Sequence, residues 1–165
     1  MALSIYINKD ITEKDNLVDL IKDSIHSDDE FEVSYDKNSI RRTPVDPDGR
    51  NTAADVHLSS GDISLDATVF YKRPDLTLVP VGELNAAEDH PVFIHHGDVE
   101  HMFETDLIPE FVRPLVSNRL NIPKDSFKIE NIDSSKWANG RIKFDITAHQ
   151  QSEVITGKTH GFIEH

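Results

Sequence analysis

The segment Asp106–Asn121 carries the most concentrated apolar stripe in the chain. Its apolar residues recur at the spacing of one side of an α-helix: Leu107, Ile108, Phe111, Val112, Leu115, Val116 and Leu120. The polar residues between them are expected to face away from the core: Arg113, Ser117, Asn118, Arg119 and Asn121. Pro114 lies inside the segment, and it should kink or split the helix because it removes a backbone donor.

Segments that alternate as β-strands lie on both sides of this helix: Ala2–Asn8, Phe31–Tyr35, Ala54–Ser59, Ile63–Tyr71, Ser126–Asn131 and Arg141–Thr147. The turn Ser60-Gly61-Asp62 indicates a hairpin between the third and fourth of them. A second amphipathic helix is predicted near Glu13–His26, with Thr12 at its start. The sequence therefore predicts an α+β fold, an antiparallel-rich β-sheet covered by one or two α-helices.

A length of 165 residues favours one α+β domain spanning 1–165. The segment Asp36–Asn51 contains two prolines and an Asp-Gly turn, and it is interpreted as a long loop. That loop leaves open a two-part organisation, with 1–40 and 50–165 on either side of 36–51.

The charge and cysteine content narrow the classes of partner. The net charge is −13, which argues against nucleic acid and against an anionic membrane surface as partners. The chain has no cysteine, so disulfides and thiolate metal sites are excluded. We see no signal peptide and no apolar run of membrane-spanning length.

The segment His90–His101 gathers residue types that bind metals: His90, His95, His96, Asp98, Glu100 and His101. Their spacing matches none of the usual zinc patterns, and it is not H-E-x-x-H. The preferred interpretation is a set of surface histidines, with no metal, no cofactor and no catalytic residue. A metal-dependent hydrolase using this cluster stays open as an alternative.

Prolines 74, 80 and 91 make Lys72–Pro91 the least regular part of the chain, which is typical of an arm that touches a neighbour. An ordinary packed loop is the alternative. The basic pairs beside it are interpreted either as local salt bridges or as docking points for an acidic partner. The candidate interface residues are Arg41, Arg42, Lys72, Arg73, Leu78, Val79, Val81, Phe93 and His95.

The run Asp48–Leu76 ends in the signature Tyr71-Lys72-Arg73-Pro74-Asp75-Leu76. It resembles a stretch in a family of uncharacterised virion structural proteins of large tailed bacteriophages. The segment Asp106–Phe127 resembles the same family's amphipathic helix and the strand that follows it. Pro114 departs from the smoother family pattern.

The resemblance implies a non-enzymatic building block of the tail, baseplate, neck or capsid. Its partners would be other virion structural proteins and copies of itself. Such a protein is made in the host bacterial cytoplasm and resides in the virion. A small intracellular binding module is a further alternative.

Overall fold

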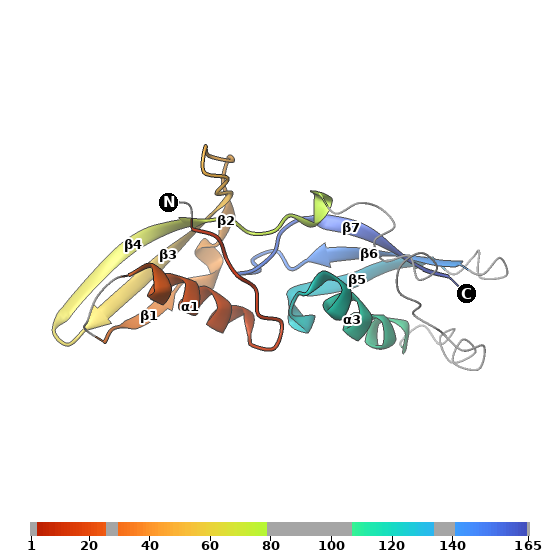
Figure 1. Cartoon of the computed structure of the whole chain (residues 1–165), viewed down its shortest axis with the longest axis horizontal. Helices are drawn as coiled ribbons and strands as arrows, with labels where there is room; N and C mark the ends of the chain where they lie inside the picture. The colour runs from red at the N-terminus through yellow and green to blue at the C-terminus, as the bar shows by residue number, and fades with distance from the viewer. Residues whose placement is uncertain (1–2, 26–29, 79–106, 134–140, 165) are drawn as a thin grey trace.

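The computed structural model describes residues 3–25, 30–78, 107–133 and 141–164, with the backbone alone at 107–111, 115, 141–142 and 162–164. Two antiparallel sheets lie side by side along the long axis of the molecule, each with one helix against it (Figure 1). This confirms the predicted α+β class. It also corrects the expectation of a single sheet, because the strands before and after the central helix pair only among themselves in the part described.

The first sheet is organised around its central strand, β3 (Thr52–Ser60). One edge of β3 pairs with β1 (Glu32–Tyr35) and β2 (Arg41–Arg42), and the other edge pairs with β4 (Ile63–Tyr71). The segment 36–51 holds β2 and the short 3-10 helix η1 (Lys37–Ser39). It therefore connects strands of one sheet and does not separate two units.

Helix α1 (Glu13–Ser24) covers the inner face of this sheet (Figure 1). Its start is confirmed as predicted, since the Thr12 hydroxyl accepts a hydrogen bond from the Asp15 N–H at 3.0 Å. Leu17 and Ile21 are buried on its stripe, and they belong to the same core as Val56 of β3.

The second sheet has the order β5-β6-β7, formed by Phe127–Asp133, Arg141–Ala148 and Lys158–Glu164. The short 3-10 helix η3 (Lys124–Ser126) leads into β5. Phe127, Phe144 and Ile146 are at most 1% exposed and form the centre of this part of the core. The alternation of β5 and β6 predicts this inward face correctly.

Helix α3 (Leu107–Leu120) lies against β5 and runs without interruption through Pro114. Of the two predicted outcomes, a kink or a split, the split is wrong, because a proline removes one backbone bond while the buried Val112 and Val116 hold both halves on the sheet. The side chains of Leu107, Ile108, Phe111 and Leu115 lie outside the described residues.

Two polar residues of α3 face inward, contrary to expectation. Ser117 is 2% exposed and donates its hydroxyl to the Ile122 carbonyl at 2.6 Å. The Arg113 guanidinium donates to the carbonyls of Lys124 and Phe127 and lies 5.4 Å from the Phe127 ring centroid. Both side chains satisfy carbonyls at the turn between α3 and β5, and that need is invisible in an apolar pattern.

The N-terminal segment is extended, but it is not the predicted strand Ala2–Asn8. Only Ser4 forms a bridge, parallel to Lys72 just beyond β4. Ile5 is buried and Tyr6 is 91% exposed, so the expected alternation of faces is present.

We expect Phe127→Ala to lower the free energy of unfolding by about 3–5 kcal/mol, because it empties a fully buried position beneath α3. Tyr6→Ala is the control, and it should stay within about 0.5 kcal/mol. Chemical denaturation of both variants measures this. Equal effects would place Phe127 outside the core.

Candidate functional site

The segment Ser152–Thr156 fills the junction between the two sheets, and each of its residues is at most 6% exposed. Backbone bonds join it to the chain that follows β4: the Leu76 N–H donates to the Thr156 carbonyl at 2.8 Å, and the Thr156 N–H donates to Pro74 at 3.0 Å. Tyr71 of β4 donates its hydroxyl to the Glu153 carbonyl at 3.0 Å. The last residues of the first sheet are therefore fixed to a segment that leads directly into β7.

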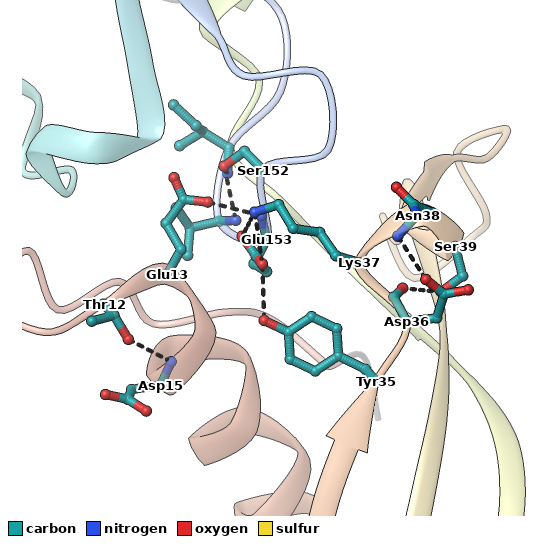
Figure 2. Close-up of polar contacts among 12 residues, drawn as sticks. Thr12, Glu13, Asp15, Tyr35, Asp36, Lys37, Asn38, Ser39, Ser152 and Glu153 are labelled. Carbon is teal, nitrogen blue, oxygen red and sulfur yellow. Dashed lines mark hydrogen bonds and ion pairs between the residues drawn. The ribbon is translucent and has the colours of Figure 1, made fainter.

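The Glu153 carboxylate is the polar centre of this junction (Figure 2). It accepts the Tyr35 hydroxyl at 2.8 Å and the Lys37 ammonium at 3.1 Å on each oxygen. Glu13, the first residue of α1, accepts the Glu153 N–H at 3.3 Å. One buried residue thus connects α1, the end of β1 and the segment before β7.

Burial raises the pKa of Glu13 to about 8, and the adjacent Glu153 carboxylate adds to the rise. Burial also opposes ionisation of Glu153, but hydrogen bonds from Glu13, Tyr35 and Lys37 outweigh it and lower the Glu153 pKa. The second oxygen of Glu13 is buried without a hydrogen-bond partner among the described residues, a position that costs a charged carboxylate more than a neutral acid. The pair is therefore a carboxylic acid beside a carboxylate.

Pairs of carboxyl groups with divergent pKa values can serve as a general acid and a general base. Here the Glu153 side chain is 3% exposed, and Tyr35 and Lys37 occupy its oxygens. A substrate therefore has no free approach to it in this arrangement. The cluster is best understood as a structural connection between the two sheets.

Glu13→Gln should remove a pH dependence of stability. The folded pKa of Glu13, about 8, lies above the ordinary 4.5, so its contribution is complete below about pH 4.5 and is lost as pH rises to about 8. The variant should lose less stability than the wild type over this range. Denaturation at several pH values measures it, with the exposed neighbour Asp15→Asn as control. Parallel pH profiles for Glu13→Gln and the wild type would contradict the assignment.

Arg73 is the sequence-predicted interface residue that the structure relocates. It is 3% exposed, and its guanidinium donates to the Ser152 carbonyl at 2.6 Å and the Ile155 carbonyl at 3.2 Å. Its Nε donates to the Thr52 hydroxyl at 2.7 Å. The expectation that Arg73 meets a partner is therefore corrected, because the junction already occupies this side chain.

The other basic candidates are exposed. Arg41 pairs with Asp55 at 3.4 Å and Arg42 pairs with Asp75 at 3.2 Å, which matches the local salt-bridge interpretation. Arg41, Arg42 and Arg73 line one cleft together with residues 148–151 and 156–157. The structure thus brings these three arginines together, whereas Lys72 lies outside this cleft and is exposed.

Of the apolar interface candidates, Leu78 ends the short 3-10 helix η2 (Leu76–Leu78) and is 81% exposed. Val79, Val81, Phe93 and His95 lie outside the described residues, as does the whole His90–His101 cluster. Within the ranges that are described, no group of three His, Cys, Asp or Glu side chains is placed to hold a metal ion.

Arg73→Met should lower the free energy of unfolding by about 2–3 kcal/mol, because buried carbonyls lose a charged donor. Arg42→Met is the matched control. It removes a surface ion pair from a side chain that is 62% exposed and should cost about 1 kcal/mol or less. Equal effects in chemical denaturation would show that Arg73 contributes no more than a surface arginine.

The outer edge of β4 is a candidate interaction surface that the sequence pattern does not indicate. Gly61, at a φ of 58°, occupies the first central position of a two-residue turn, so Ser60 and Ile63 form the hydrogen-bonded closing pair. Odd-numbered residues of β4 therefore bond to β3, and even-numbered ones point their backbone groups away from it. Two bonds confirm this alternation of backbone direction. The carbonyl of the odd-numbered Tyr71 accepts from the Asn51 N–H just before β3, whereas the N–H of the even-numbered Lys72 donates to Leu3, away from β3.

The outward backbone groups of β4 belong to Ser64, Asp66, Thr68 and Phe70. None of them bonds to another residue in the described part of the chain. Apolar side chains accompany this open edge: Ile63 is 75% exposed, Leu65 57% and Phe70 46%. The turn Ser60-Gly61-Asp62 and the β-branched composition of Ile63–Tyr71 predict the hairpin, but no local pattern indicates that its outer edge has no partner among the described strands.

No helix among the described residues is long and apolar enough to cross a membrane. Neither the protein-family models, nor the curated proteins, nor the solved structures contain a match to this chain.

Proposed function

We propose that this protein is a non-enzymatic structural component of a tailed-bacteriophage virion that assembles through protein–protein contacts. The virion assignment rests on the resemblance of Asp48–Leu76 and Asp106–Phe127 to virion structural proteins. The assembly role rests on one observation: the backbone groups on the outer edge of β4 have no partner in the part of the chain that the structure describes.

An open edge of this kind favours association for two physical reasons. Its N–H and C=O groups offer a row of hydrogen bonds to an added strand, as in β-augmentation. Its apolar side chains, Ile63 and Leu65, gain free energy when a partner removes them from water. The usual protections of an edge are sparse here, because β4 contains no proline and Asp66 is its single charged residue.

The junction supports the same proposal. Glu153, Arg73 and Tyr71 make buried contacts within the chain and hold the two sheets in one arrangement. A building block needs this kind of internal rigidity, since a partner then binds a surface that is already formed. The proposed partners are other virion proteins and further copies of the chain, and the proposed site of synthesis is the host cytoplasm.

Mass spectrometry of purified phage particles tests the proposal directly. The chain should be present at a fixed ratio to the other particle proteins, and it should remain through density-gradient purification. Its absence from particles, while it is abundant in the infected host cell, would contradict the virion role.

Elemental analysis of the purified protein tests the competing metal-dependent hydrolase. We expect no stoichiometric zinc or manganese. Bound metal that is lost in a His96→Ala, His101→Ala double variant, but retained in a His57→Ala control, would favour the hydrolase instead.

A further inference from the structure

We propose that the outer edge of β4 pairs with β4 of a second copy of this chain, antiparallel and centred on Ala67. The inference deepens the proposed assembly role, on which it rests, by naming the partner. The two copies would share one continuous sheet across a twofold axis at Ala67.

The extent of the open edge is the first argument. At one end the turn Gly61-Asp62 closes the hairpin. At the other end the backbone groups of Lys72 are already used, because its N–H donates to Leu3 at 3.0 Å and its carbonyl accepts from Ile5 at 3.4 Å. Among the residues that the structure describes, the open groups therefore run from Ser64 to Phe70, and the midpoint of that stretch is Ala67.

A twofold axis at Ala67 satisfies all of these groups. It places Ser64 opposite Phe70 of the second copy, and Asp66 opposite Thr68. These outward-facing residues become hydrogen-bonded pairs that exchange both backbone bonds. No group of the open stretch is left without a partner.

The side chains also match in this register. Directly opposed residues lie on the same face of a sheet, so the inner-face residue Leu65 meets Val69 and Ala67 meets Ala67. Leu65 is 57% exposed, whereas Val69 packs against the core. The exposed half of each strand therefore lies beside the sheltered half of the other.

Other registers are disfavoured for specific reasons. A shift by one residue places apolar side chains on the polar face. A shift of the pairing by two residues towards the turn puts Asp66 opposite Asp66, which is repulsive. The opposite shift requires the backbone groups of Lys72, which Leu3 and Ile5 occupy.

Ala67 has the size that the axis requires. Ala67–Ala67 is a non-hydrogen-bonded pair, in which the Cα atoms approach to about 4.5 Å. A large side chain at this position would meet its own copy. Because disulfides span Cα separations of about 4.4–6.8 Å, cysteines at this position are within bonding reach.

The net charge of −13 on each copy opposes association over long range. Salt screens that repulsion, whereas the backbone hydrogen bonds and the apolar burial depend little on the salt concentration. The dimer fraction should therefore rise between about 0.05 M and about 0.5 M salt. An interface held by ion pairs would respond in the opposite direction.

The absence of cysteine makes a crosslinking test unambiguous. In the full-length chain, Ala67→Cys should give a disulfide-linked dimer as the major species under mild oxidation. Leu65→Cys and Val69→Cys should each stay largely monomeric alone, but their mixture should form the mixed dimer. Tyr6→Cys, at an exposed position outside the stretch Ser64–Phe70, is the control for random collision.

Three results would each overturn the proposal. In the first, Ala67→Cys stays monomeric while circular dichroism shows a native fold. In the second, Leu65→Cys crosslinks as well alone as in the mixture, and in the third, sedimentation of the wild type shows less dimer as the salt concentration rises. The first of these, combined with protection of β4 in particles, would assign the edge to a different virion protein. The particle experiment and this one are independent, so the virion role and the β4 pairing can fail separately.

Discussion

The fold depends on burying a polar segment, Ser152–Thr156, between two sheets. Its carbonyls accept from Arg73 and Tyr71, and its Glu153 carboxylate accepts from Tyr35 and Lys37. A buried carboxylate and a buried guanidinium are costly unless their hydrogen bonds are complete. The donors lie in the first half of the chain and the acceptors near its end, so neither sheet can satisfy these polar groups in the absence of the other.

This constraint explains the rest of the molecule. Because Tyr71 and Arg73 are held at the junction, the base of the β3–β4 hairpin is fixed and its far end extends away from the core, where Ile63 and Leu65 are exposed. Helix α1 covers one face of the hairpin and Leu3–Ile5 covers only its base. Because of how the two sheets join, no described strand pairs with the outer edge of β4.

Local features were predictable from the sequence, and long-range ones were not. The Thr12 cap, the stripe of α1, the Gly61-Asp62 turn and the alternation of β6 depend on neighbouring residues, and each is found. The separation into two sheets and the burial of Glu153 and Arg73 depend on contacts between residues about eighty positions apart or more. Charged residues are usually exposed, so a sequence pattern assigns them to the surface by default. For the same reason the sequence predicts Arg73 at an interface. The outer edge of β4 depends on which strands pair with β3, so a local pattern does not indicate it.

Amide hydrogen exchange along β4 tests the central claim, that its outer edge is open, most directly. At a concentration where the chain is monomeric, the amides of Ser64, Asp66, Thr68 and Phe70 should exchange rapidly. Those of Leu65, Ala67 and Val69, which donate to β3, should be protected. Uniform protection of all seven amides in the monomer would show that another part of the chain covers this edge, and would contradict the account.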